Sequence, residues 1–372
     1  MNPKNLVINL LFLFGTILLC VLVFAAYFFR EAKIYFRTHQ TYYTGDSFIE
    51  EDPQIGFRQR PNIKMQHIAP PVYTVYSDDL GLRVEKEGLQ SPSTVDLLAV
   101  GCSFTWGHGV EDPATYIKVL GRKENLRVAN AALASFGTTA ALLSLDRFAH
   151  LRPKVVIYGF IEDHISRSLE PCAPTLSPYC RSIAFVDFTA EGAPFIHTPE
   201  FISSEYYSYT RDVGMDHRFG FKDVYWTIRR SLLTLTKKDG WSINKRFRKN
   251  MTPERREKAL RFLIDQMVAK TRAMKAKLII AYLPLVTEIR PPPPELDKAL
   301  EGHLDQHDVF FVDVAPAMAA AEKRFGVTKF KAGGVDGHPS EAAHEIIAES
   351  IAPVLDLALE QNRAATGSVG RR

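Results

Sequence analysis

The sequence lacks a long run of charge of either sign. Its 46 lysine and arginine residues nearly balance its 42 aspartate and glutamate residues, which leaves a formal net charge of +4 over 372 residues. A protein dedicated to binding nucleic acid carries clustered basic residues, so this near balance argues against such a role. Charged residues make up 24% and hydrophobic residues 46%, which excludes a disordered or low-complexity chain.

Cysteine is also scarce, with four residues in the chain. No second cysteine pair and no nearby histidine pair completes a zinc set, so we expect neither a metal nor a cofactor. The stretch 101–109 contains glycines but lacks the Gly-Lys-Ser/Thr ending of a phosphate loop, which argues against nucleotide binding. Cys172 and Cys180 flank a proline-rich segment. A disulfide between them is the favoured interpretation and would place this part of the chain outside the cytosol; two separate thiols are the alternative.

Residues 6–29 form one long apolar stretch without a charge. At about 1.5 Å per residue, a helix of this length crosses a bilayer core of about 30 Å. We therefore predict an uncleaved membrane anchor over residues 1–30, with a cleaved signal peptide and a buried core helix as the alternatives. Basic residues flank the stretch on both sides, so the positive-inside rule gives no clear orientation. Together with the candidate disulfide, the anchor favours a single-pass membrane protein whose domain is periplasmic or otherwise extracytoplasmic.

Short apolar runs alternate with helical patterns from residue 94 onward, which predicts a parallel sheet covered by helices on both faces. The predicted strands are 95–100, 127–133, 154–160, 276–285 and 309–314, and the predicted helices are 138–150, 253–275 and 339–359. The predicted divisions are an irregular N-terminal arm with short strands over 31–93, a main domain over 94–360, an insertion or lid at about 166–250, and a flexible tail over 361–372.

Polar side chains follow the ends of the predicted strands. Ser103 lies in a glycine-flanked turn after the first strand, Gly137 follows the second, and 162–164 (Glu-Asp-His) follow the third. Asp336 and His338 precede the last helix. Parallel sheets bind ligands at the carboxyl ends of their strands, so these side chains are candidates for one site. A serine hydroxyl becomes a nucleophile when a histidine takes its proton and a carboxylate orients that histidine.

On these motifs the sequence resembles the SGNH (GDSL-type) hydrolase superfamily over about residues 94–356. GCSFTWG resembles the first block and implies a nucleophile at Ser103, whose N–H also faces the oxyanion. SFGT resembles the second block and implies an oxyanion donor at Gly137, while DGHPSEAAHEIIAESI implies the base His338 and its partner Asp336. The resemblance implies a flavodoxin-like three-layer αβα sandwich of about five parallel strands. The arm, with its phrase LGLR, resembles the segment that precedes the domain in membrane-anchored bacterial members.

The chain departs from the family pattern at three places. Cys102 replaces an aspartate outside the triad, and the acid–base pair has the shorter Asp-x-His spacing; neither is expected to change the chemistry. The third block carries Glu162-Asp163 where the family has an asparagine whose amide donates to the oxyanion. An ionised glutamate cannot donate and would repel that charge. Glu162 therefore points elsewhere, is protonated, or is replaced as donor by another group such as His164; loss of one donor costs about 10²–10³ in rate.

The resemblance implies a membrane-anchored serine esterase that acts on an acylated carbohydrate or lipid. An O-acyltransferase or deacetylase of cell-envelope polysaccharide remains an alternative, as does a non-catalytic scaffold for polysaccharide assembly. For three further features we favour an interpretation without a functional role. We expect His344 on the surface of the last helix and His108 outside the pocket, with a pocket-lining His108 as the alternative. The basic segment 245–249 reads as a solvated turn, with contact to anionic lipid or glycan as the alternative.

Overall fold

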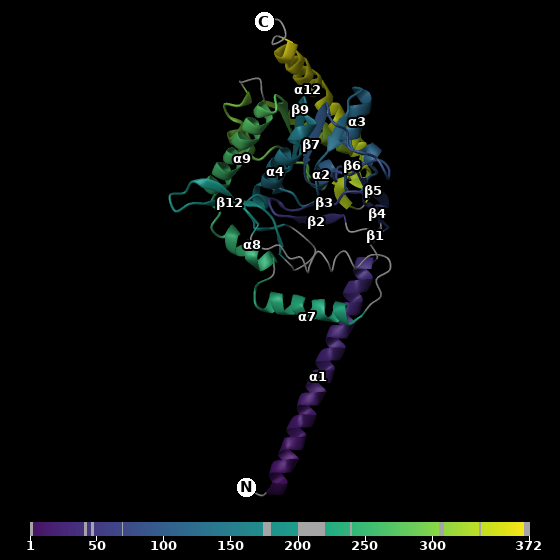
Figure 1. Cartoon of the computed structure of the whole chain (residues 1–372), viewed down its shortest axis with the longest axis vertical. Helices are drawn as coiled ribbons and strands as arrows, with labels where there is room; N and C mark the ends of the chain where they lie inside the picture. Colours follow the sequence, from purple (N-terminus) through teal and green to yellow (C-terminus); the bar gives the residue numbers. More distant parts are fainter. Residues whose placement is uncertain are drawn as a thin grey trace.

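The structure is a computed structural model that describes residues 3–40, 43–45, 48–68, 70–173, 180–199, 220–238, 240–304, 309–334 and 336–367. A nine-stranded mixed sheet lies at its centre, in the order β1-β4-β5-β6-β8-β7-β9-β14-β15 (Figure 1). Five of these strands are parallel to one another: β7 (Leu97–Gly101), β8 (Val128–Asn130), β9 (Val155–Phe160), β14 (Lys277–Tyr282) and β15 (Val309–Asp313). The five predicted strands are confirmed. Numbered along the chain, they lie in the flavodoxin-like order 2-1-3-4-5, as expected.

Helices cover both faces of the parallel strands. One layer contains α4 (Thr138–Phe148), α9 (Pro253–Ala273) and α10 (Pro294–Leu300), and the other contains α3 (Tyr116–Lys123), α11 (Ala315–Phe325) and α12 (Glu341–Gly367). Successive strand residues face opposite layers: Val156 and Leu278 pack into the first layer, whereas Val155 and Ile279 pack into the second. Burial on both faces explains why these strands are continuous apolar runs rather than alternating ones. The predicted α/β sandwich is therefore confirmed.

The N-terminal arm is part of the same sheet. Its strand β6 (Arg83–Val84) pairs antiparallel with β8. The sheet continues through β5 (Tyr73–Ser77), β4 (Lys64–His67) and β1 (Tyr43–Gly45), while β2 (Ile49–Asp52) and β3 (Gly56–Gln59) form a separate hairpin. The segment 31–93 was predicted to be an irregular arm with short strands. Its first residues belong to α1 (Pro3–Gln40), and most of the short strands that follow extend the sheet by antiparallel pairing. These strands are too short for their periodicity to stand out.

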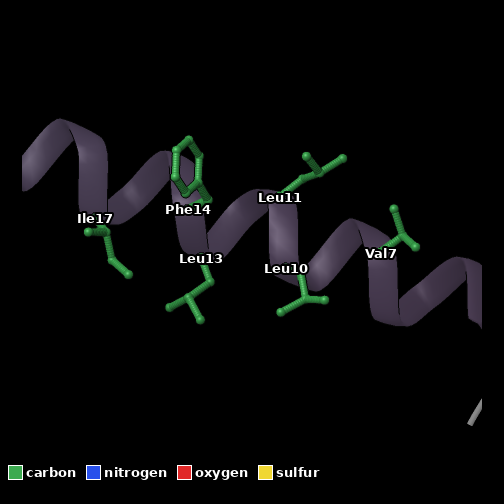
Figure 2. A pocket seen from close by; sticks show the side chains of 6 residues that line it. All are labelled: Val7, Leu10, Leu11, Leu13, Phe14 and Ile17. Atoms are coloured by element: carbon green, nitrogen blue, oxygen red, sulfur yellow. The ribbon is translucent and has the colours of Figure 1, made fainter.

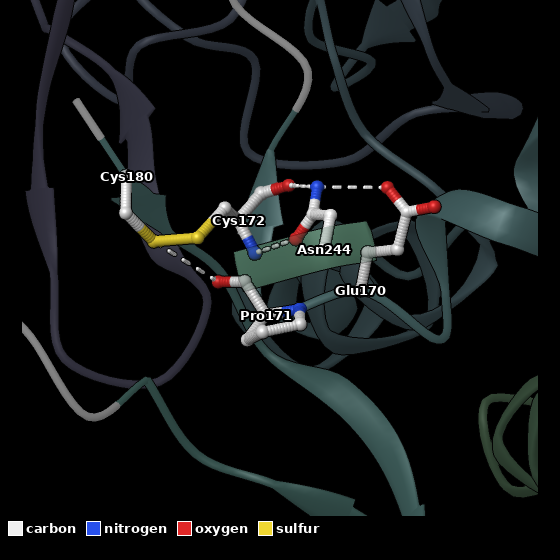
Figure 3. The surroundings of a disulfide bond; sticks show 5 residues. All are labelled: Glu170, Pro171, Cys172, Cys180 and Asn244. Carbon is white, nitrogen blue, oxygen red and sulfur yellow. Dashed lines mark hydrogen bonds between the residues drawn. A yellow bond between two sulfur atoms is a disulfide. The ribbon is translucent and has the colours of Figure 1, made fainter. Parts of the chain in front are cut away.

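The insertion at 166–250 forms structure beside the large sheet. It contains the hairpins β10 (Cys172–Ala173) with β11 (Arg181–Ser182) and β12 (Phe185–Phe188) with β13 (Pro194–His197), followed by α7 (Phe221–Leu235) and α8 (Gly240–Arg248). The basic segment 245–249 therefore begins inside α8 rather than in a turn. A disulfide joins Cys172 and Cys180, so the predicted pairing is confirmed (Figure 3). Asn244 of α8 bonds both the N–H (3.1 Å) and the carbonyl O (2.7 Å) of Cys172.

Helix α1 (Pro3–Gln40) projects from the domain (Figure 1). Its segment Asn5–Ile34 is the one helix among the described residues that is long and apolar enough to cross a membrane, and its apolar window is wholly exposed. Apolar side chains leave the helix in different directions, as Figure 2 shows for Val7, Leu11 and Leu13. Such an exposed, all-round apolar helix is a transmembrane or signal-sequence candidate, and it excludes the core-helix alternative.

Short elements complete the fold: α2 (Ser103–Trp106), α5 (Asp163–Arg167), the 3₁₀ turns η1 (Asp112–Ala114), η2 (Ala149–Leu151) and η4 (Val327–Phe330), and the pair β16 (Lys331–Ala332) with β17 (Asp336–Pro339). The tail prediction fails in part, because α12 continues to Gly367. Asn362 explains the extension, since its Nδ2 donates to the carbonyl O of Lys275 at 2.7 Å and ties the helix to the domain. Residues 368–372 lie outside the described residues.

Candidate active site

Ser103 stands where β7 turns into α2. Gly101 makes this turn possible: its φ is +150°, and a Cβ there would lie 2.6 Å from Thr105 Oγ1 and 2.8 Å from the carbonyl O of Gly159. Cys102 follows as the residue before the helix and is fully buried, which raises the pKa of its thiol. The tight turn places the Ser103 hydroxyl at the carboxyl edge of the sheet, between the loops that follow β8 and β9.

His338 and Asp336 come from the other end of the chain, on β17. His338 Nε2 lies 2.8 Å from Ser103 Oγ, and His338 Nδ1 lies 2.5 Å from Asp336 Oδ1. The same carboxylate oxygen accepts the backbone N–H of His338 at 2.9 Å, which fixes the turn between the two residues. Because the carboxylate accepts a hydrogen bond from Nδ1–H, Nε2 is the nitrogen left to accept the serine proton. The structure thus brings together the three residues that the sequence put forward as a triad.

His108 adds a second imidazole to this cluster. Its ring centroid lies 4.3 Å from that of His338, and its Nε2 lies 3.8 Å from Asp336 Oδ2. Tyr73 OH and His108 Nδ1 are 2.9 Å apart, so a strand of the arm holds this ring in place. Of the two alternatives for His108, the site position is the one that the structure bears out.

The two imidazoles set the charge on Asp336. Burial raises the pKa of this carboxyl. Its interactions with His108 and His338 together lower the pKa by more than burial raises it, so the net pKa lies well below the ordinary value. Burial likewise lowers the pKa of His108, against the opposing effect of Asp336. Asp336 is therefore the ionised member of the cluster, as a carboxylate that stabilises an imidazolium must be.

The same three side chains are the group of described residues with metal-binding geometry. Ligand atoms of His108, Asp336 and His338 lie within 4.8 Å of one another. An ion bound through His338 Nε2 would displace the contact to Ser103 Oγ, and an ion bound through Nδ1 would displace the hydrogen bond to Asp336. Metal binding and the serine–histidine–aspartate arrangement therefore exclude each other at this position.

Arg83, on strand β6 of the arm, supports the turn that follows Ser103. Its Nη1 donates to the carbonyl oxygens of Trp106 and Gly107, both at 2.6 Å, and its Nη2 donates to that of Val110 at 2.5 Å. The guanidinium also lies 4.7 Å from the Trp106 ring centroid and 3.9 Å from Asp112. Arg83 is 1% exposed, so the whole group is buried. Arg83 ends the phrase LGLR, but nothing in the sequence pattern marks it as part of the site.

Gly137 is the residue before α4, at the end of the loop after β8. This loop contacts the turn between Gly101 and Ser103, because Leu133 N–H donates to the carbonyl O of Gly101 at 3.1 Å. A Cβ at Gly137 would lie 2.9 Å from Arg167 Cβ and 3.0 Å from the backbone N of Ser168, so a side chain does not fit there. The close approach explains the glycine, and the role of its N–H toward an oxyanion stays a prediction.

The third-block residues take three different positions. Glu162 precedes α5 and lies near Tyr282: burial mainly raises the pKa of that tyrosine to about 12, and the negative charge of Glu162 adds to the effect. Asp163 forms an ion pair with Arg167 at 3.1 Å and is half-exposed. Asp163 is therefore engaged by Arg167, and the role of Glu162 toward an oxyanion stays a prediction.

His164 is not suited to replace the missing amide. It is fully buried, and burial lowers its pKa well below the ordinary value, so the ring is neutral. Tyr158 OH lies 2.8 Å from both Thr138 Oγ1 and His164 Nδ1, so this side of the ring is engaged inside the protein. Substitution of the donor by His164, one of the three possibilities, is therefore disfavoured.

His344 contradicts the expectation of a surface position. It is fully buried, its ring stacks on Tyr116 at 5.9 Å, and its Nδ1 accepts the Tyr116 backbone N–H at 3.2 Å. The reason is that this side of α12 packs against α3 rather than water. Burial lowers the pKa of His344 to about 3.

No protein-family model matches the chain, and no curated protein matches it in sequence. Among solved structures, TesA is 16% identical, with a TM-score of 0.35 and coverage of 70% of this chain and 98% of that one. LAE5, a hydrolase from the metagenome of Lake Arreo, is 13% identical (TM-score 0.36; coverage 72% and 97%). A family two carbohydrate esterase from Clostridium thermocellum is 14% identical (TM-score 0.33; coverage 73% and 67%). Likeness this low carries no conclusion about family or substrate, which rest on the chain's own residues.

Proposed function

We propose that the chain is a membrane-anchored serine esterase that hydrolyses carboxylic O-acyl esters. The observation that carries this proposal is the pair of hydrogen bonds at His338, 2.8 Å to Ser103 Oγ and 2.5 Å to Asp336 Oδ1. Structural serine and histidine residues do not require this order of contacts, whereas nucleophilic catalysis does. A non-catalytic scaffold would have no use for it.

The geometry supports a two-step acyl transfer. Ser103 Oγ attacks the ester carbonyl while its proton passes to His338 Nε2, and Asp336 stabilises the resulting imidazolium. In our proposal, the N–H groups of Ser103 and Gly137 hold the negative oxygen of the tetrahedral intermediate. His338 then gives its proton to the leaving alcohol, and the acyl group stays on Ser103. Water then attacks the acyl-enzyme while its proton passes to His338. His338 gives this proton to Ser103 Oγ as the carboxylic acid leaves.

Two further features support the proposed location. The apolar helix α1 suits a permanent anchor, and the disulfide between Cys172 and Cys180 suits an oxidising, extracytoplasmic compartment. A periplasmic reporter and a cytoplasmic reporter fused after Arg372 test the orientation. Activity of the periplasmic reporter alone is expected, and activity of the cytoplasmic reporter alone would contradict the exported domain.

Labelling by a fluorophosphonate probe tests the activated serine. The full-length protein in detergent is compared with Ser103→Ala, His338→Ala and the control Ser166→Ala, whose serine lies on α5. We expect labelling of the wild type and the control and none of the two site variants. A folded wild type that does not label would reject the esterase. Product analysis with a polysaccharide acceptor present then separates hydrolysis from O-acyl transfer, in which a sugar hydroxyl replaces water.

A further inference from the structure

We propose that α7 lies in the headgroup region of the membrane and seats the domain against the lipid surface. This inference rests on the proposed membrane anchor, to which it adds a second contact that does not span the bilayer. The occupant of the surface is lipid, and the argument begins with the exposed face of α7.

An apolar stripe runs along the full length of α7. Its members are Phe221, Tyr225, Ile228, Leu232 and Leu235, which follow one another at steps of four, three, four and three residues. That spacing places all five on one side of a helix. All five are exposed, with Phe221 93% and Leu235 78% exposed. A continuous exposed apolar surface of this kind marks a membrane or protein contact.

The opposite side of α7 is buried. Asp223, Trp226 and Thr227 lie there, each less than 9% exposed. Helix α7 packs against α1, where Phe28 and Ala32 are buried one turn apart. Figure 1 shows α7 lying across α1, between the domain and the long free part of α1. The stripe therefore faces away from this contact, while the helix lies across the proposed span.

Helix α7 contacts α1 near the end of its apolar stretch, where a membrane-spanning helix would leave the hydrocarbon core. Phe28 is near the end of the apolar stretch 6–29, and its neighbours Phe24, Tyr27 and Phe29 are exposed aromatic residues. Aromatic side chains gather at the boundary between headgroups and acyl chains. A helix lying in that plane buries its apolar side by about 5–10 Å, and we infer that the α7 stripe does so.

Charge around α7 and α8 suits anionic headgroups. Asp239 is the one acidic residue of the sequence between 224 and 250, whereas lysine and arginine recur there. Trp241 is 64% exposed, and Lys245 Nζ lies 4.8 Å from its ring centroid. Basic residues beside exposed Trp, Phe and Leu are the composition of helices that lie in a membrane interface, which favours lipid as the occupant.

Helix α8 links this surface to the domain. Asn244 Nδ2 donates to Glu170 Oε2 at 2.8 Å (Figure 3). Arg248 Nε pairs with the same carboxylate at 2.5 Å. Glu170 lies shortly after α5, the helix of the third block. The contacts hold α8 to the domain, so lipid contact at α7 would fix the orientation of the active site above the membrane.

Depth-dependent quenching tests the position of α7. The full chain, in a Cys20→Ser background, is labelled with bimane at Leu232→Cys on α7, at Leu13→Cys on α1, or at the control Leu357→Cys on α12. The protein is reconstituted in vesicles of phosphatidylcholine and phosphatidylglycerol. Nitroxides on the lipid headgroup or acyl chain, and iodide in the water, then report the depth of each label. Both Leu232 and Leu357 are exposed in the protein, which makes them a matched pair.

We expect the label at 232 to be quenched by lipid nitroxides near the interface at least fivefold more strongly than the label at 357, and the label at 13 to be quenched by acyl-chain nitroxides. Lipid quenching at 13 but not at 232 overturns the inference and leaves the anchor standing. Protection of 232 from iodide without lipid quenching also overturns it, because the occupant is then a protein or a second copy. Absence of lipid quenching at both positions overturns the inference together with the anchor.

Discussion

Arg83 and Trp106 form one buried unit, with the guanidinium 4.7 Å from the indole ring centroid and Nη1 donating to the Trp106 carbonyl O at 2.6 Å. Trp106 ends the short helix that begins with Ser103. A charge buried this deeply is stable only when hydrogen bonds and an ion pair satisfy it, and Asp112 supplies the latter. The N-terminal arm, through Arg83, therefore stabilises the turn that holds Ser103.

Arg83→Met keeps much of the side-chain volume and removes the donors, so it leaves three buried carbonyl groups and Asp112 without this partner. We expect a loss of about 3–5 kcal/mol in the free energy of unfolding, measured by denaturant titration, with probe labelling of Ser103 reduced in the protein that remains folded. Lys64→Met is the control, because Lys64 is exposed and pairs with Glu87 on the surface; its effect should stay within about 0.5 kcal/mol. Equal effects of the two variants would contradict the role of Arg83.

The parallel core was predictable because its strands are buried on both faces. Stretches such as Val155–Phe160 therefore read as unbroken apolar runs, and their order along the chain gives the carboxyl edge at which Ser103 stands. His338 and Asp336 were also within reach, since they lie two residues apart in a recognisable block. Local patterns carried this part of the fold and the site.

Contacts between residues far apart in the sequence could not be predicted from such local patterns. Arg83 is on a strand of two residues, whose pairing with β8 leaves no periodic signal. His108 follows Ser103 closely in the chain, but its ring is held by Tyr73, a partner 35 residues away. His344 was misplaced because the packing of α12 on α3 decides which side of the helix is buried, and a lone histidine does not reveal it.

His108 is expected to position Asp336 rather than to react itself. His108→Ala removes an imidazole 3.8 Å from Asp336 Oδ2 and should lower kcat for p-nitrophenyl acetate on the order of tenfold, less than the roughly 10²-fold that misplacement of a catalytic group costs. Asp336 keeps its hydrogen bonds from His338, which is why the loss is partial. His108→Gln retains a donor and should recover part of the rate. Wild-type kinetics in His108→Ala would show that the second imidazole is dispensable.

Acid sensitivity of the fold should depend on His344. Burial lowers its pKa from about 6.5 to about 3, so the unfolded chain binds a proton more readily than the folded protein. Stability is therefore lost as the pH falls below about 6.5, by roughly 2 kcal/mol at pH 5. His344→Asn keeps an acceptor for the Tyr116 N–H and removes the titration, so its unfolding free energy should fall less between pH 7 and pH 5. The control is His150→Asn, because His150 is exposed. If the unfolding free energy of His344→Asn falls between pH 7 and pH 5 as much as that of the wild type, His344 is not the source of the acid sensitivity.

Glu162 offers the sharpest test of the oxyanion site. Glu162→Asn places a neutral amide where the family pattern has one, so it removes a negative charge and adds a donor. If hydrolysis is limited by the missing donor, kcat/KM for p-nitrophenyl acetate should rise about tenfold or more, up to the roughly 10²–10³ that one donor supplies. Asp163→Asn, one residue further on and paired with Arg167, is the matched control and should bring no gain. A Glu162→Asn enzyme no faster than the wild type would mean that the backbone N–H groups already stabilise the oxyanion, and that the glutamate serves the site in another way.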